Sequence, residues 1–441
     1  MSESLQYRIR GRDAASVARS IEQGVLRGAL EPGEALPSVR ALAKQLSLSP
    51  TTVASAYRDL RQRGVLVAHD RSRTTVAHRP PLAVRLVPTL PADALDLATG
   101  NPDPQLLPDL GPGLRAVGPV HRLYGEHPIV DSLAERAHED FAADGIDSEN
   151  LAIVGGALDG IERVLEVHCR VGDRVAVEDP GYIGTLDLVR ALGLEPVPMA
   201  VDDEGPRPDD LDAALRSGVA AVLVVPRAQN PTGAAWTATR VAALRAVLAE
   251  HPEPLIIEDD AAAGIAGRPW HSLTPEREQW AVVRSVAKAL GPDLRVAALV
   301  GDADTVTRVQ GRQRLGTGWV SHLLQRLAAT VWNTAIADGT LERAAAAYTE
   351  RRTALLEALA DHVIVAHGAS GLNVWIPVVE EVPVVQALAA RGWAVQAGEP
   401  FRIISEPGIR VTVAALEADA ARAFADDLAD VFGASVSTRR G

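Results

Sequence analysis

Lys288 is unusual among the basic residues of this 441-residue chain. The chain has 44 Lys plus Arg, and only Lys44 and Lys288 are lysines. A lysine amine can lose its proton near neutral pH and attack a carbonyl carbon, whereas an arginine guanidinium stays protonated. Lys288, within SVAKALGPDLR, is therefore a candidate for a covalent link to an aldehyde, although a surface lysine left by chance is the simpler interpretation of that residue alone.

Three further motifs supply what an aldehyde cofactor such as pyridoxal 5′-phosphate requires. Asp259 follows the apolar run LII at the expected end of a strand, where a carboxylate faces the ligand crevice of an α/β sheet and can hold the ring nitrogen protonated. Tyr182 in EDPGY could stack on the ring, and Asn230 in QNPTG could bond the ring hydroxyl. A solvated loop acid, a core tyrosine and a plain turn remain alternative interpretations of these motifs.

A phosphate site is predicted in IVGGALDGIERVL, residues 153–165. Its glycine pair precedes a helix start, so the backbone N–H groups of Gly156 and Ala157 can hold a phosphate. Ser285 and Arg295 flank Lys288 and could complete the phosphate cup. We expect no metal site.

The sequence around these motifs predicts an α/β body with a mostly parallel sheet, because expected helices alternate with short apolar runs. The runs are RVAVEDP, AAVLVVP, PLIIEDD and VAALVG. Residues 79–95 contain four prolines and predict a semi-rigid linker before this body.

The segment before the linker predicts a winged helix-turn-helix, with two short helices, a tight break and a hairpin. A solvated helical pair is the alternative. The second helix would enter the major groove, and the hairpin tip would meet the DNA backbone or minor groove. Candidate contacts from this pattern are Ser38, Arg40, Thr51, Thr52, Ser55, Arg58, Arg71 and Arg73.

The distribution of charge indicates a basic head that binds a polyanion, joined to an acidic body that does not. The net charge is −13, yet residues 1–78 hold 12 Lys plus Arg against 7 Asp plus Glu. No apolar run is long enough to span a membrane, and the N-terminus lacks the apolar core of a secretory signal. With a single cysteine, Cys169, the chain cannot form an internal disulfide, and we expect a cytoplasmic protein.

The head segment GALEPGEALPSVRALAKQLSLSPTTVASAYRDLRQRGVL resembles the GntR-type winged helix. That resemblance implies DNA binding as a dimer, with contacts from Arg40, Ser49, Thr51, Thr52 and Arg58. From about residue 96 to 435, the motifs GNPDPQLLP, GGALDGIERVL, EDPGY, NPTG, EDD, SVAKALGPDLR and IRVTVAAL resemble fold-type I aminotransferases. Together the two halves resemble a MocR-type regulator.

The resemblance implies a winged helix-turn-helix domain (1–78), the linker (79–95) and an α/β fold-type I, aminotransferase-like domain with large and small subdomains (96–436). It implies that Lys288 is the Schiff-base lysine and Asp259 the ring-nitrogen partner. Arg410 in IRVTVAAL would bind an effector carboxylate, and Tyr124 would reach the cofactor of a partner subunit in a homodimer. The other implied cofactor contacts are Asn230, Tyr182, Gly156, Ala157, Ser285 and Arg295.

Two positions depart from the family pattern. Ala261 stands where many relatives have a tyrosine that donates to the ring oxygen, and Ala287 stands where a serine is frequent. The loss of the phenol puts efficient transamination in doubt more than cofactor binding. We expect a pyridoxal 5′-phosphate-dependent transcriptional regulator that binds an operator in double-stranded DNA and senses an amino compound or the cofactor itself. An active aminotransferase with a DNA-binding head, and a regulator that has lost its cofactor, remain alternatives.

Overall fold

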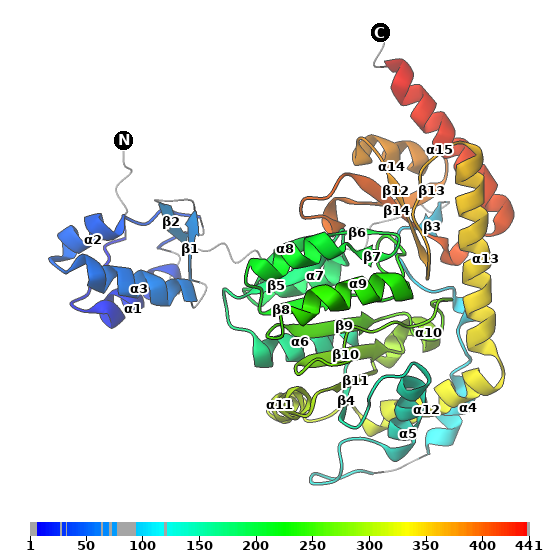
Figure 1. Cartoon of the computed structure of the whole chain (residues 1–441), viewed down its shortest axis with the longest axis horizontal. Coiled ribbons are helices and arrows are strands. Elements are labelled where there is room, and N and C mark those ends of the chain that lie inside the picture. The colour runs from blue at the N-terminus through cyan, green and yellow to red at the C-terminus, as the bar shows by residue number, and fades with distance from the viewer. Residues whose placement is uncertain are drawn as a thin grey trace. The chain divides into compact units, whose positions relative to one another are not determined.

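The computed structural model describes residues 7–26, 29–31, 33–62, 65–69, 73–76, 94–118 and 121–438. We call residues 7–76 the head and residues 94–438 the body, and each is described by itself (Figure 1). All but the last two residues of the predicted linker lie outside the described residues. No helix in the described part of the chain is long and apolar enough to cross a membrane.

The head is a three-helix module followed by a hairpin, which confirms the predicted winged helix-turn-helix. Its elements are α1 (Ala14–Leu26), α2 (Val39–Leu46), α3 (Pro50–Gln62), β1 (Leu66–His69) and β2 (Arg73–Val76). The strands pair antiparallel. Tyr57 is buried on the inner face of α3, and its hydroxyl donates to the Pro37 carbonyl just before α2 at 2.8 Å. That contact fixes α2 and α3 relative to each other.

The large lobe of the body is built on an eight-stranded sheet. In spatial order its strands are β4 (Leu151–Val154), β11 (Ala297–Gly301), β10 (Trp280–Ser285), β9 (Leu255–Asp260), β8 (Ala221–Val224), β5 (Arg174–Asp179), β6 (Glu195–Asp202) and β7 (Gly205–Pro206). Neighbours from β5 to β10 run parallel, whereas β11 runs antiparallel to both β10 and β4. The four runs predicted as strands are β5, β8, β9 and β11, so the mostly parallel sheet is confirmed.

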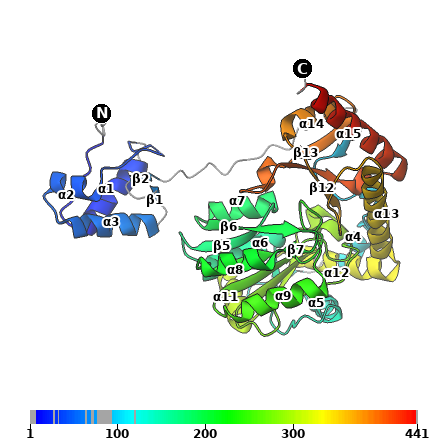
Figure 2. The ribbon, with the colours of Figure 1, turned by 45° about the horizontal axis from the view of Figure 1, so that its top comes forward.

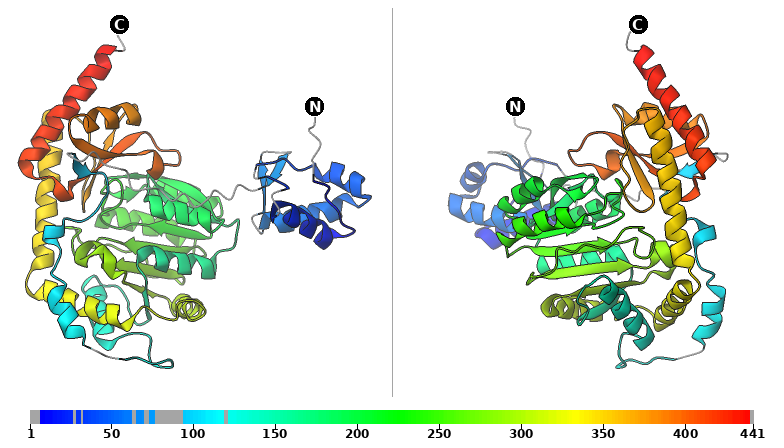
Figure 3. Two further views of the ribbon diagram at one scale, coloured as in Figure 1. Left: turned by 180° about the vertical axis from the view of Figure 1, so that it is seen from behind. Right: turned by 45° about the vertical axis from the view of Figure 1, so that its right-hand side comes forward.

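Helices cover both faces of this sheet, as Figure 3 shows. They include α6 (Ala157–His168), α7 (Ile183–Ala191), α8 (Pro208–Arg216), α9 (Ala238–Ala249) and α11 (Ala303–Arg314). Beside them lie α4 (Gly111–Val117), α5 (Asp131–Ala143), the one-turn α10 (Ala287–Leu290) and α12 (His322–Ala337). Because both faces are covered, β8, β9 and β10 are buried along their whole length. β8 is apolar throughout, whereas β9 and β10 end in buried polar residues.

The small lobe has a four-stranded sheet ordered β12 (Asn373–Pro377), β14 (Gly408–Thr412), β13 (Trp393–Ala397) and β3 (Leu95–Leu97). The edge strand β3 pairs with β13 alone, in parallel. Three helices pack here: α13 (Thr340–Asp361), α14 (Glu381–Ala389) and α15 (Ala418–Thr438). In Figure 2 the long α13 runs along the body to this lobe. This lobe supplies the predicted small subdomain.

A buried charge network holds the functional edge of the large sheet. Arg284 of β10 is 1% exposed and donates to Asp260 of β9 at 2.8 Å. Two carboxylates at the end of α5, Asp140 and Asp144, accept from its other nitrogens at 2.6 and 2.5 Å. Arg227, which follows β8, also donates to Asp260, at 2.8 Å. Burial opposes ionisation of Asp260, yet the two guanidinium groups hold its pKa below the ordinary value.

Replacing Arg284 with alanine should destabilise the body by about 3–5 kcal/mol, because buried Asp260 loses one of its two cations. All seven tryptophans lie in the body, so their fluorescence in a urea titration measures the body without the head. Arg308→Ala is the matched control, since its pair with Asp304 is exposed and should change the free energy of unfolding by less than about 0.5 kcal/mol. Equal effects of the two variants would contradict a role for the network.

Candidate functional site

The predicted cofactor residues meet where the parallel strands end. Asp259 lies near the end of β9, Ser285 ends β10, and Lys288 follows in α10. Tyr182 follows β5 and Asn230 follows β8. Because parallel strands present their carboxyl ends at one edge, these residues surround a single cavity of about 220 Å³. The cavity is also lined by Gly100, Ala157, Leu158, Val225, Ala228, Ala261, Ala262, Ala287, Pro292, Arg295, Leu372 and Asn373.

Lys288 is a partly buried residue whose amine has no carboxylate partner among the described residues. Its Nζ donates to the backbone carbonyl of Gly100 at 2.5 Å. Burial away from water, together with the nearby Arg410 cation, lowers the pKa of Lys288 to about 8. A larger fraction of the amine is therefore neutral, and nucleophilic, at neutral pH than for an exposed lysine.

Asp259 is a buried carboxylate with an unused acceptor. Its Oδ1 has no hydrogen-bond partner in the described structure, and the residue is 4% exposed. Burial, and next the charge of Asp260, raises the pKa of Asp259 to about 7. A carboxylate in this state binds well to a cationic N–H donor, because such a donor supplies both the missing hydrogen bond and the missing charge.

The predicted phosphate cup is formed by α6 and the residue Arg295. Gly156 has φ +113°, and a Cβ added there would lie 2.9 Å from a terminal nitrogen of Arg295. Only glycine therefore lets this guanidinium approach the backbone just before α6. Ala157 begins α6, so its N–H is among the free donors of a helix N-terminus. Ser285 lines the same cavity.

Arg410 projects from β14 of the small lobe and is 4% exposed. One terminal nitrogen donates to the Ala98 carbonyl, and the other donates to Asn230 Oδ1 at 3.3 Å. Its Nε has no partner in the described structure. Burial lowers the pKa of Arg410 to about 10, so the guanidinium stays cationic at neutral pH. A buried cation with spare donors suits a carboxylate.

Tyr124 does not line the cavity of its own chain. Its side chain is 93% exposed and touches Trp319 edge-on, with ring centroids 5.6 Å apart. In the head, Ser38 caps α2, because its side chain accepts from the Ala41 N–H. Ser49 accepts from the Thr52 N–H and lies 2.7 Å from the hydroxyls of Thr51 and Thr52.

The exposed face around α2 and α3 also carries Arg40, Ser55 and Arg58. Arg71 and the side chain of Arg73, predicted at the hairpin tip, lie outside the described residues. Six of the predicted DNA contacts therefore lie on or next to α2 and α3 with side chains at least partly exposed: Ser38, Arg40, Ser49, Thr51, Thr52 and Arg58.

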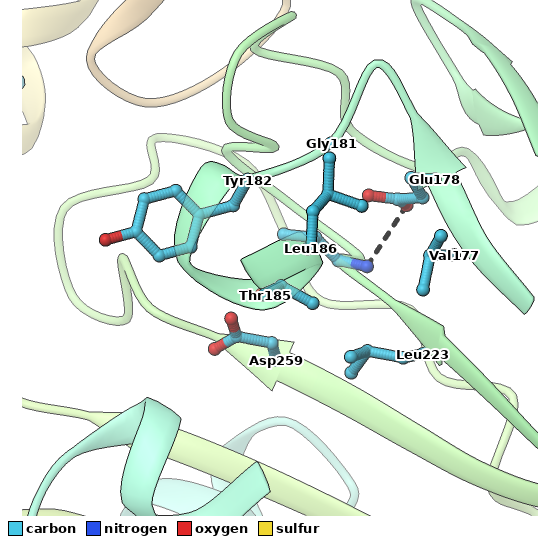
Figure 4. Close-up of a pocket in the computed structure, with 9 residues that line it drawn as sticks. Val177, Glu178, Gly181, Tyr182, Thr185, Leu186, Leu223 and Asp259 are labelled. Carbon is cyan, nitrogen blue, oxygen red and sulfur yellow. Dashed lines mark hydrogen bonds between the residues drawn. The ribbon is translucent and has the colours of Figure 1, made fainter. Parts of the chain in front are cut away.

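Two residues of the site were not predicted from the sequence. Gly100 starts the motif GNPDPQLLP, but nothing in the motif shows that its carbonyl reaches Lys288. Glu178 ends up buried behind Tyr182, and burial raises its pKa to about 8. Figure 4 shows Tyr182 and Asp259 on one side of a second, smaller cavity of about 20 Å³ and Glu178 on the other. Glu178 is the first residue of the motif EDPGY, but only the fold shows that its carboxyl group is buried.

Comparison with known families accounts for both halves of the chain. Residues 13–76 match the bacterial regulatory proteins of the gntR family, and residues 108–428 match aminotransferase class I and II. The vitamin B6 salvage pathway transcriptional repressor PtsJ of Salmonella typhimurium is 36% identical over 95% of this chain and 98% of its own. The chain belongs to the GntR-type regulators that carry an aminotransferase-like body.

Another relative is the pyridoxine biosynthesis transcriptional regulator PdxR of Corynebacterium glutamicum, 30% identical over 59% of this chain and 60% of its own. The α-aminoadipate aminotransferase LysN of Thermus thermophilus shares the body's fold, with a TM-score of 0.70, 22% identity and coverage of 79% of this chain and 94% of that one. The protein is a transcriptional regulator, and its cofactor is pyridoxal 5′-phosphate.

The residues present fit this cofactor. The unpartnered Asp259 Oδ1 would accept from a ring N–H, the amine of Lys288 shares the same cavity, and Arg295 closes on the glycine turn. No cluster of three or more His, Cys, Asp or Glu side chains suited to a metal ion occurs among the residues that the structure describes.

The covalent attachment of pyridoxal 5′-phosphate should become faster as pH rises through about 8, the pKa of Lys288, because only the neutral amine attacks. Stopped-flow absorbance would measure this rate. Borohydride reduction followed by peptide mass spectrometry should place the adduct on Lys288, and Lys288→Arg should abolish it. Lys44→Arg, the matched control on the other lysine, should leave rate and adduct unchanged. A flat pH profile, or an adduct on Lys44, would contradict the assignment.

Proposed function

We propose that this protein is a transcriptional regulator whose body holds pyridoxal 5′-phosphate through Lys288 and reports occupancy of that cavity to a DNA-binding head. The observation that carries the proposal is the pairing, in one cavity, of a partly neutral, partly buried amine with an unpartnered buried carboxylate. We assign the head to residues 1–78, the linker to 79–95 and the effector domain to 96–436.

Each residue of the cavity has a distinct task in this proposal. When bound, pyridoxal 5′-phosphate supplies an aldehyde that reacts with primary amines. Asp259 keeps a proton on the ring nitrogen, Tyr182 packs on the ring, and Asn230 accepts or donates at the ring oxygen. Arg410 offers a cationic fork to the carboxylate of an amino compound. Gly156, Ala157, Ser285 and Arg295 hold the phosphate.

The cavity wall favours sensing over turnover. Ala261 lines the cavity beside Lys288 but has no polar side-chain atom. Asn230, the one predicted partner of the ring oxygen, already accepts from Arg410. With no phenol to tune proton transfer at the ring oxygen, the site is better suited to holding a ligand than to repeated proton transfer.

We also propose a homodimer in the cytoplasm, where the regulator meets its DNA. The support is the pair of exposed apolar side chains Leu123 and Tyr124, 71% and 93% exposed. A second copy of this chain covering that surface would bring Tyr124 toward the partner's cavity, as the family pattern implies.

Arg58→Ala should lower DNA affinity by about tenfold and reduce the dependence of affinity on salt by about one phosphate contact, because Arg58 is an exposed cation on the recognition helix α3. The measurement is a binding titration over a range of salt, with a duplex that the full-length protein has selected from a random pool. Arg19→Ala, an exposed arginine on α1, is the matched control and should bind normally. Unchanged binding by Arg58→Ala would show that α3 does not read the DNA through this residue.

Mixing the purified protein with amino acids and 2-oxo acids should change its absorbance spectrum without multiple turnover, because Ala261 cannot donate to the ring oxygen. Chromatography of the products would count amino groups transferred per protein, with Lys288→Ala as the blank. Product accumulating far beyond the protein concentration would instead support an active aminotransferase.

A further inference from the structure

Residues 95–103, here called the strap, are the first stretch of the body along the chain, and Gly100 in this segment lines the cavity. The strap starts as β3, where Leu97 is fully buried in the small lobe. It ends at Asp103, whose N–H donates to the Tyr348 hydroxyl at 3.0 Å and whose carboxylate accepts from Arg351 at 2.9 Å. Both ends are thus held by the body, and Gly100 between them lines the cavity.

The middle of the strap supplies acceptors to two cations of the site, the buried Arg410 and the partly buried Lys288. The Ala98 carbonyl accepts from Arg410, and the Gly100 carbonyl accepts from Lys288. Neither cation has a carboxylate partner among the described residues, so these two neutral carbonyls are their main acceptors. Gly100 has φ +70°, and an added Cβ would lie 3.3 Å from both terminal nitrogens of Arg410. The strap is fitted closely against the guanidinium.

The shape of the strap depends on Asp96. Its Oδ1 accepts from the N–H groups of Ala98 and Thr99, each at 2.9 Å, and its Oδ2 accepts from the Thr99 hydroxyl at 2.5 Å. This local turn directs the Ala98 and Gly100 carbonyls toward the cavity. Asp96 itself does not line the cavity.

Occupancy of the cavity competes with these contacts. If Lys288 were joined covalently to the cofactor, its nitrogen would keep at most one N–H in place of three, which would weaken its hold on the Gly100 carbonyl. A carboxylate is a stronger acceptor than a neutral carbonyl, so it displaces Ala98 from Arg410. Both carbonyls then lose donors in a buried place, and the strap must shift to recover hydrogen bonds.

We propose that the strap is the element that converts occupancy of the cavity into a signal for the head, an inference that rests on the function proposed above. Without ligand, the strap is tied to Lys288 and Arg410. With ligand it is released, and the short edge strand β3, paired on one side only, loosens from β13. The chain runs from β3 back to the head, so the release changes where the linker leaves the body.

Hydrogen exchange of the full-length protein tests the release directly. Two probes are used: pyridoxal 5′-phosphate, which engages Lys288, and N-(5′-phosphopyridoxyl)-L-leucine, which adds a carboxylate for Arg410. Each probe should speed exchange of the amides of residues 95–99 by about fivefold or more, as expected for the loss of one or two hydrogen bonds. DNA affinity for the selected duplex should change by a similar factor in the same samples.

Asp96→Ala should remove the turn, so that residues 95–99 exchange rapidly and DNA affinity equals that of the loaded wild type, with or without probe. Asp96→Asn keeps an Oδ1 acceptor for the two N–H groups and should restore the response. Asp147→Ala is the matched control, because Asp147 makes the same kind of turn to the Glu149 N–H at an exposed site. Tryptophan fluorescence during urea unfolding checks that every variant is folded.

The outcomes separate the two proposals. A wild-type protein that binds the cofactor but keeps constant DNA affinity contradicts the proposed function, whereas the strap is judged by hydrogen exchange and by the response of the Asp96→Ala protein. Probes that leave the exchange of residues 95–99 unchanged overturn the strap. So does an Asp96→Ala protein, folded and loaded, whose DNA affinity still responds as the wild type does.

Discussion

The body is organised around charges that its own side chains leave unpaired. The partly buried Lys288 and the buried Arg410 are cations without an ion-pair partner in the described structure, and Asp259 is a buried carboxylate with an empty acceptor. A buried unpaired charge costs free energy, which a folded chain tolerates only where the surrounding structure is rigid enough to hold it. The covered parallel sheet, with the Arg284 network across β9, β10 and α5, provides that rigidity.

The consecutive residues Asp259 and Asp260 show how the fold separates structure from function within one strand. Successive side chains of a strand point to opposite faces, so the two carboxylates enter different environments. Asp260 meets Arg227 and Arg284, which keep its pKa low, whereas Asp259 faces the cavity, where burial raises its pKa to about 7. One carboxylate stabilises the sheet, and the other remains available to a ligand.

Much of this arrangement could be predicted from the sequence, because it depends on local patterns. The apolar runs identified β5, β8, β9 and β11, and the rule that ligands bind at strand ends identified Asp259. The strap could not be predicted in this way, since Gly100 meets Lys288 across 188 positions of sequence and the contact uses a backbone carbonyl common to all residues. The Arg284 network could not be predicted either, because the sequence of β10 does not show which carboxylates at the end of α5 lie beside Arg284.

The strength of the strap contacts bears on how such a regulator responds. Two hydrogen bonds to charged groups contribute about 3–6 kcal/mol at most. The net change is smaller, because the ligand's own contacts replace these bonds. One cavity therefore supplies roughly 1–3 kcal/mol of coupling between ligand binding and DNA binding. A nearly complete switch between two states needs about 5.5 kcal/mol. A single chain would therefore respond gradually to its ligand. Two cavities acting on one pair of heads would approach a full switch, which gives the proposed homodimer a physical reason beyond the symmetry of its DNA site.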